Sequence, residues 1–114
     1  MPALSVIFYR TDAGNEPVRT WLRQMSADER RIIGEDLRVV QLRWPLGMPL
    51  VRKMKPDLWE LRSTVPDGIV RVFFTVWELH VVLLHGFNKK TQKTPDNELD
   101  TACRRLAQFK RNAP

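Results

Sequence analysis

The sequence predicts an α+β domain in the order β-α-α-β-β-β-α, with a mostly antiparallel sheet, an N-terminal helical hairpin and a C-terminal helix. Apolar residues recur with helical spacing in residues 17–44 and again near the C-terminus. From Leu50 the spacing changes to a period of two, and residues 69–76 are rich in β-branched and aromatic residues. Because 114 residues suit one hydrophobic core, we expect a single domain over residues 1–114.

The N-terminal part of the chain predicts one strand followed by two helices. Residues 1–10 are typical of a first β-strand, and turn-forming residues follow them. Pro17 suits the opening turn of a helix whose apolar stripe has i, i+3, i+4, i+7 spacing. Ser26 and Glu29 have the spacing of a capping box, which predicts a second helix that ends near Pro45.

The remaining part predicts a meander of three strands and a last helix. The strands cover residues 58–65, 69–76 and 79–87, with Pro, Asp and Gly in the first connection and a short turn in the second. We expect Thr94 to cap the last helix with its hydroxyl and Pro95 to occupy the first helical position.

The composition narrows the partners and the cellular compartment. A formal charge of +6 and a sequence pI near 10.1 favour a nucleic acid, an acidic membrane surface or an acidic protein as partner. No apolar run approaches the roughly 20 residues of a membrane-spanning helix, so we expect no membrane partner. The single cysteine, Cys103, excludes an intrachain disulfide and fits the cytoplasm. We expect no metal and no cofactor.

A cluster of lysines follows the last predicted strand. Lys89, Lys90 and Lys93 lie within five residues, between the strand end and the start of the last helix. Such a cluster suits a polyanion, although a solvated loop is the alternative interpretation of a basic run.

The polar residues of the central strands are the second candidate feature. Glu60 and Arg62 are two residues apart and so project from one face of a strand. Arg71 lies between two valines in the next strand, where a charge needs a carboxylate partner or a bound anion. The sequence leaves both interpretations open: an ion pair between Arg71 and Glu60, or a phosphate site.

These groups together could cleave a phosphodiester. Glu60 could take the proton from an attacking 2′-hydroxyl, and Arg62 or Arg71 could hold the phosphate through bidentate contacts. Lys90 could stabilise the developing charge or protonate the leaving oxygen, with its pKa lowered by neighbouring cations. His85, at the end of the last strand, is a further acid or base, with a hydrogen-bonded structural histidine as the alternative.

Three segments resemble the HigB-type, phage-derived Gp49-like branch of the RelE/ParE toxin superfamily. They are Leu-Trp-Glu-Leu-Arg at 58–62, Gly-Ile-Val-Arg-Val-Phe-Phe at 68–74, and Leu-His-Gly-Phe-Asn-Lys-Lys-Thr-Gln-Lys-Thr-Pro at 84–95. The resemblance implies the toxin of a type II toxin–antitoxin module that cuts mRNA, usually on the ribosome. It also implies metal-independent transesterification and an antitoxin with a helix-turn-helix domain.

The resemblance carries over to some residues and not to others. Arg71 matches the sheet arginine of the superfamily, and Lys89 with Lys90 matches its basic pair after the last strand. RelE itself has lysines where this chain has Leu58 and Glu60, so its acid–base assignment does not transfer whole.

Other basic residues near these segments are expected to contact RNA. Lys53 and Lys55, just upstream of the first meander strand, could replace the missing RelE lysines, and Lys89 and Lys93 could bind the RNA backbone. Two other functions fit the same features: a ParE-like toxin that acts on DNA gyrase, and a non-catalytic domain that binds RNA or the ribosome.

Overall fold

The protein was analysed as a computed structural model, which describes residues 3–89 and 94–113, with Lys89 described by its backbone alone. The elements in chain order are β1 (Ser5–Phe8), α1 (Pro17–Arg23), α2 (Ala27–Arg43), β2 (Val51–Lys55), β3 (Leu58–Val65), β4 (Gly68–Trp77), β5 (His80–Lys89) and α3 (Asp96–Asn112). The predicted α+β class is confirmed. Strand β2 is an addition to the predicted order.

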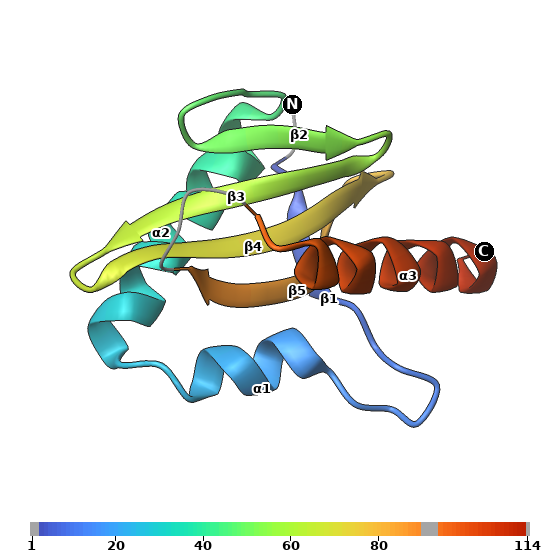
Figure 1. Cartoon of the computed structure of the whole chain (residues 1–114). Helices are drawn as coiled ribbons and strands as arrows, with labels where there is room; N and C mark the ends of the chain where they lie inside the picture. The colour runs from blue at the N-terminus through green and yellow to red at the C-terminus, as the bar shows by residue number, and fades with distance from the viewer. Residues whose placement is uncertain (1–2, 90–93, 114) are drawn as a thin grey trace.

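One five-stranded sheet in the order β1-β5-β4-β3-β2 organises the molecule. Only β1 runs parallel to its neighbour β5, so the prediction of a mostly antiparallel sheet is confirmed. Helix α1 packs against β5 and α2 against β3 and β1, while α3 covers the other face, against β5 and β4 (Figure 1). None of the helices in the described part of the chain is long and apolar enough to cross a membrane.

Strand β2 escaped prediction because it is an edge strand with little apolar pattern. Of its residues only Val51 is buried, while Arg52, Lys53 and Lys55 are exposed. Cations on an edge strand discourage pairing with other chains, so this composition is typical of a sheet border.

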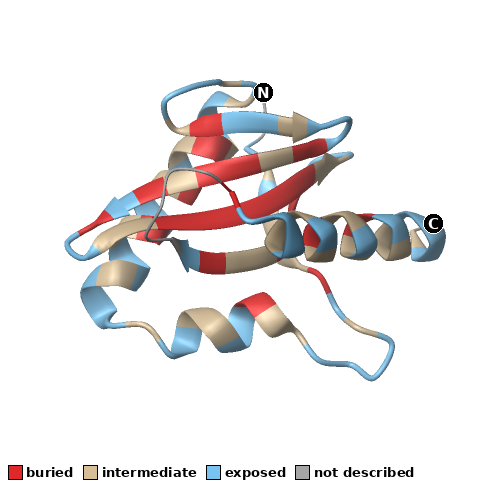
Figure 2. Cartoon of the chain, in the orientation of Figure 1, coloured by how far each residue is buried: buried red, intermediate tan, exposed pale blue. Residues whose placement is uncertain are grey.

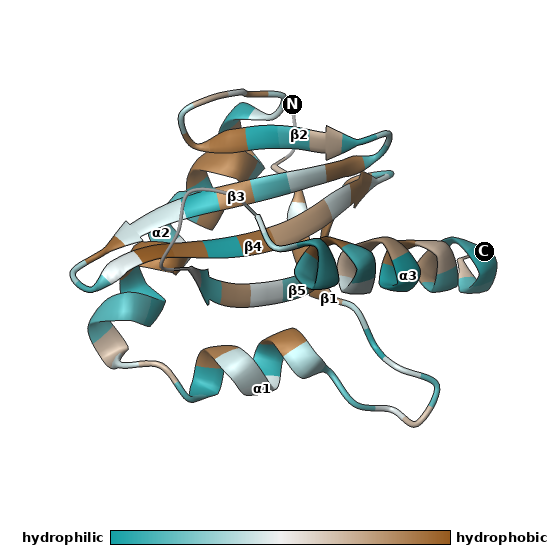
Figure 3. Ribbon diagram, in the orientation of Figure 1, coloured by the Kyte–Doolittle hydropathy of each residue, from teal (hydrophilic) through white to brown (hydrophobic). Residues whose placement is uncertain are grey.

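The two faces of the sheet hold separate apolar clusters. Figure 2 shows that β3 and β4, at the centre of the sheet, are buried along most of their length. Figure 3 shows hydrophilic residues alternating with more apolar ones along α3. The cluster under α1 and α2 includes Val18, Ile33 and Phe74, and the cluster under α3 includes Phe73 and Leu106. The strands are therefore fixed between two layers, and polar side chains on the α3 face are held in rigid surroundings.

Two of the three helix starts that the sequence predicted have different outcomes. The capping box of α2 is confirmed, since Glu29 N–H donates to Ser26 Oγ at 3.2 Å and Ser26 N–H donates to the Glu29 carboxylate at 3.2 Å. For α3 the prediction is wrong: Pro95 is the N-cap residue, and Thr94 makes no cap. The Thr94 hydroxyl instead donates to a buried carboxylate on β3.

A β-bulge at Leu84 changes which residues of β5 face α3. Phe73 pairs with His85 and Phe74 pairs with Leu83, so Leu84 is the extra residue. Both Leu84 and His85 consequently face α3, and Gly86 faces α1. The bulge delivers His85 to the face on which Glu60 and Arg71 lie.

Candidate functional site

Glu60 and Arg71 form a buried ion pair between β3 and β4. Arg71 Nη1 donates to Glu60 Oε1 at 2.6 Å, and the side chains are 1% and 0% exposed respectively. Thr94 Oγ1 donates to the other carboxylate oxygen, Glu60 Oε2, at 2.9 Å. Of the two interpretations that the sequence left open, the structure shows the ion pair.

The Glu60–Arg71 pair does not reach solvent. This burial matters for the predicted roles of Glu60 as a general base and of Arg71 as a phosphate contact. Both oxygens of Glu60 are hydrogen bonded within the protein, whereas a general base must contact the proton that it takes. Arg71 Nε is buried and has no hydrogen-bond partner among the described residues. In this arrangement Glu60 and Arg71 tie two central strands to the start of α3.

His85 lies in a second polar cluster, where both ring nitrogens have partners. Arg105 Nη1 lies 3.2 Å from His85 Nδ1, and Glu98 Oε2 lies 3.3 Å from His85 Nε2. Because a guanidinium can only donate, Nδ1 must be an acceptor, and Nε2 then carries the proton that is donated to Glu98. The structure thus shows a histidine that is hydrogen bonded at both ring nitrogens.

Arg105 also satisfies the backbone at the bulge. Its Nη1 donates to the carbonyl oxygen of Leu84 at 2.9 Å, and its guanidinium lies 5.6 Å from the centre of the Tyr9 ring. A bulged residue has no ladder partner, so this contact supplies a hydrogen bond that the sheet cannot. Arg105 therefore fastens the middle of α3 to β5.

The structure keeps the two clusters apart. In the strand register, Phe73 of β4 stands opposite Glu60 on one side and opposite His85 on the other. The rings of Phe73 and His85 are stacked with centroids 6.4 Å apart. His85 borders a hollow of about 190 Å³ beside α1, to which Glu60 does not contribute.

The pKa of His85 is lowered below its usual 6.5, first because burial disfavours the charged ring and also because Arg105 is cationic, while Glu98 acts in the opposite direction. We expect an NMR titration of the imidazole to give a pKa below 6.5. Arg105→Gln should raise this pKa, and Glu98→Gln should lower it further. A wild-type value at or above 6.5 would contradict the arrangement described.

The same shift couples folding to pH. Between the folded pKa and 6.5 the unfolded chain binds the proton on His85 and the folded chain does not. The stability that His85 contributes is therefore complete above pH 6.5 and is lost as the pH falls through that window. In His85→Phe, which keeps a ring between its aromatic neighbours, this part of the pH dependence should disappear from urea unfolding curves.

The other predicted site residues lie at the periphery of these clusters or outside the described residues. Arg62 is half-buried, and its Nη1 lies 3.9 Å from Met48 Sδ, in the connection between α2 and β2. Lys53 and Lys55 are exposed on β2. The described residues contain no group of three or more His, Cys, Asp or Glu side chains that could hold a metal ion.

The lysine cluster is only partly described. The backbone of Lys89 ends β5, where it pairs with Ile69. The side chain of Lys89, together with Lys90 and Lys93, lies outside the described residues. The described ends of this connection are anchored, by strand pairing on one side and by the Thr94 hydrogen bond on the other.

Sequence reasoning missed the contacts that α3 makes with the sheet. Glu98 and Arg105 are seven residues apart, so they lie on one side of the helix, beside its apolar stripe. This spacing indicates in the sequence that the two side chains share a helix face, but it does not identify the residues that they contact. Arg52, opposite Glu60 in the register, is a further exposed cation that the sequence reading left out.

Comparison with known proteins identifies the family of this chain. Residues 20–107 match the family described as phage derived protein Gp49-like. Two relatives, each named "Probable endoribonuclease HigB1", come from Mycobacterium tuberculosis strains CDC 1551 / Oshkosh and ATCC 25618 / H37Rv. Each is 32% identical over 107 residues, which cover 91% of this chain and 83% of the relative. The chain therefore belongs to the phage-derived Gp49-like family, within the HigB-like branch of the RelE/ParE toxins.

Proposed function

We propose that this protein is the toxin of a type II toxin–antitoxin module and cleaves mRNA, in association with the ribosome. The observation that carries the proposal is the similarity to relatives named as endoribonucleases over 91% of the chain. The charge of +6 supports an RNA partner, because a basic surface attracts the phosphate backbone. The proposal includes an antitoxin of the helix-turn-helix type and a place in the cytoplasm.

The proposed reaction is a transesterification that needs no metal. The 2′-oxygen attacks the neighbouring phosphorus and the bond from phosphorus to the 5′-oxygen breaks, leaving a 2′,3′-cyclic phosphate and a 5′-hydroxyl. A base takes the proton of the 2′-hydroxyl, and an acid protonates the 5′-oxygen. Catalysis by such a site depends mainly on cations placed where negative charge develops.

The roles proposed for the residues rest on their charge and on their places in the sequence. We propose that Arg62 and Lys90 contact the scissile phosphate, with Lys90 as the acid, and that Lys53, Lys55, Lys89 and Lys93 hold the RNA backbone. Glu60 and Arg71 hold β3, β4 and the start of α3 in place. For Glu60 to accept the 2′-hydroxyl proton, its hydrogen bonds with Arg71 and Thr94 must be exchanged for one with the substrate.

Primer extension on mRNA in a bacterial translation extract tests the proposal. The wild-type protein should produce discrete new 5′ ends, and Lys90→Ala should lower their rate of formation by about 10²- to 10³-fold, the usual effect of losing one charge-stabilising contact. Arg31→Gln is the matched control, since this exposed cation lies on α2 and pairs with Glu35. It should cleave at the wild-type rate.

The same extract separates the other functions. Intact mRNA together with gyrase-dependent DNA breaks would replace the proposal with a ParE-like toxin. Tight RNA or ribosome binding without new 5′ ends would leave a non-catalytic binding domain.

A further inference from the structure

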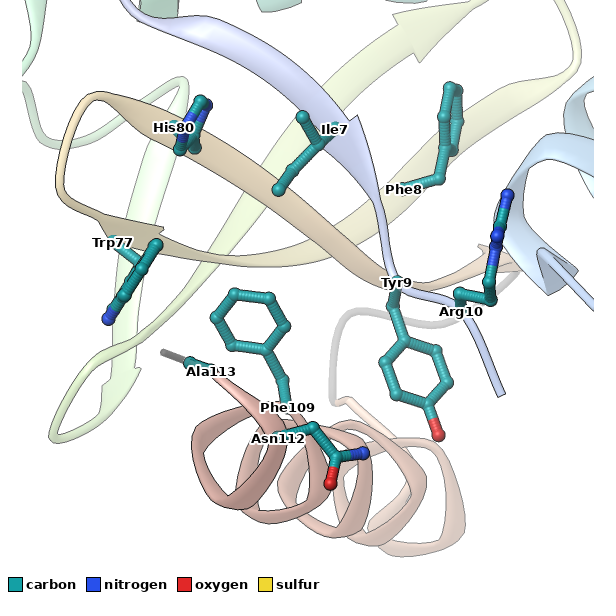
Figure 4. A pocket seen from close by; sticks show the side chains of 9 residues that line it. All are labelled: Ile7, Phe8, Tyr9, Arg10, Trp77, His80, Phe109, Asn112 and Ala113. Atoms are coloured by element: carbon teal, nitrogen blue, oxygen red, sulfur yellow. The ribbon is translucent and has the colours of Figure 1, made fainter. Parts of the chain in front are cut away.

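A cavity lies at the C-terminal end of α3, at the other end of this helix from the Glu60–Arg71 pair. It is lined by β1 and the residues that follow it, by the facing ends of β4 and β5, and by the C-terminal end of α3 (Figure 4). Its volume is about 290 Å³. Because sites for small molecules begin at roughly 300 Å³, this cavity suits a single ring system.

Aromatic rings form much of its wall. In Figure 4 the side chains of Tyr9, Trp77 and Phe109 surround the cavity, with Ile7 beside them. Trp77 and Phe109 meet edge to face, with centroids 5.9 Å apart and planes at 83°. The Tyr9 hydroxyl donates to the Gln108 side chain, which holds that ring in place. Such a wall offers fixed π faces and edges to a flat aromatic ligand.

Polar groups stand beside these rings. Arg10 contributes to the lining, its side chain is 68% exposed, and its nearest acid is Glu16 at 3.9 Å. Glu16 is also bonded by Arg19 at 2.8 Å, so the charge of Arg10 is only weakly compensated. Asn112 adds a carboxamide, which can donate to and accept from a base edge. Arg111, next to it, adds an exposed positive charge.

We propose that this cavity binds one nucleobase of a single-stranded RNA, with Arg10 contacting the adjacent phosphate. Single-stranded RNA is recognised by stacking of unstacked bases on aromatic side chains and by cations along the backbone. The inference rests on the proposed function, which makes RNA the substrate. An apolar side chain of a protein partner would fill the same volume but would give Arg10 and Asn112 no role.

The position of the cavity determines how a bound base would affect the kinetics of cleavage. Helix α3 has 17 residues, or a length of about 25 Å, and the Glu60–Arg71–Thr94 cluster lies at its other end. The bound base therefore belongs to a nucleotide well away from the scissile bond. Such a contact is the same in the ground state and the transition state, so it lowers KM and leaves kcat unchanged.

Binding of a 2′-O-methyl oligoribonucleotide, which cannot be cleaved by 2′-hydroxyl attack, tests the proposal. Fluorescence anisotropy should show affinity about tenfold weaker for Arg10→Gln and for Trp77→Leu than for the wild type. Arg31→Gln, another exposed arginine paired with one glutamate, should stay within about twofold of the wild type. An otherwise identical abasic oligomer, which has no base to enter the cavity, should bind the wild type, Trp77→Leu and Arg31→Gln with similar, weaker affinity.

The possible outcomes are distinct. Cleavage assays should show a raised KM and an unchanged kcat for both cavity variants, and Arg10→Gln carries the test if Trp77→Leu does not fold. Equal affinities of Arg10→Gln and wild type for the oligomer, with cleavage intact, would overturn the cavity assignment alone. Loss of antitoxin binding in Trp77→Leu without loss of oligomer binding would assign the cavity to a protein side chain. Absence of cleavage by the wild type would refute the proposed function, while the oligomer titration would still decide the cavity.

Discussion

Replacing Arg71 by Met is expected to lower the free energy of unfolding by about 3–5 kcal/mol, because it leaves the Glu60 carboxylate buried without its cation. That loss is a large share of the roughly 5–15 kcal/mol of a typical domain. Urea unfolding followed by circular dichroism measures it. A loss of cleavage in Arg71→Met can therefore be assigned to the site only after the variant has been shown to be folded.

A double variant separates the ion pair from other effects of the substitution. Glu60→Leu combined with Arg71→Met replaces both charges by apolar groups and should restore most of the lost stability, or exceed the wild type. Arg62→Met is the single-site control, since Arg62 stands opposite Arg71 in the register but is half-exposed. It should change stability by less than about 1 kcal/mol. A double variant as unstable as Arg71→Met would show that the pair itself does not cause the effect.

Gly86→Ala is expected to destabilise the protein by about 1–3 kcal/mol, the usual cost of overpacking. A Cβ at this position would lie 2.6 Å from Trp21 Cε3, well inside van der Waals contact. The indole of α1 therefore rests directly on the backbone of β5, and an added methyl group forces it away. Thermal unfolding of the purified protein measures the loss.

Two further variants make the cause specific. In a Trp21→Ala background, where the obstructing ring is absent, Gly86→Ala should cost little, so the two substitutions should be strongly non-additive. Gly34→Ala is the matched glycine control, because a Cβ there meets no atom within 4 Å and the position lies within α2. It should stabilise the protein by about 0.5–1 kcal/mol through helix propensity. Additive losses at positions 21 and 86 would contradict the contact.

The parts of the fold that were predictable depend on local chemistry. The capping box at Ser26 and the proline at the start of α1 act within one helical turn, so their signals are complete in the sequence. The three meander strands were visible from their alternation and their turns. Strand β2 was not counted as a separate strand, because it is short and only one of its residues, Val51, is buried.

The candidate site was less predictable because its contacts join distant segments. That Arg71 required a counterion or an anion followed from its valine neighbours, but the choice of Glu60 depends on the register of β3 and β4. The local sequence predicted Thr94 as a helix cap, but its hydroxyl instead donates to the buried carboxylate of Glu60, 34 residues away. The partners of His85 depend on a bulge, for which a single sequence contains no signal.

That bulge makes Leu84 an extra residue whose removal would not disturb the order of the faces along β5. Deletion of Leu84 would leave Leu83 opposite Phe74 and His85 opposite Phe73, so His85 would still face α3 and Gly86 would still face Trp21. The deletion would remove the Leu84 side chain from the apolar cluster under α3. Arg105 would lose the Leu84 carbonyl oxygen as an acceptor but keep His85 Nδ1. The cost of such a deletion should therefore be confined to the contact between α3 and β5.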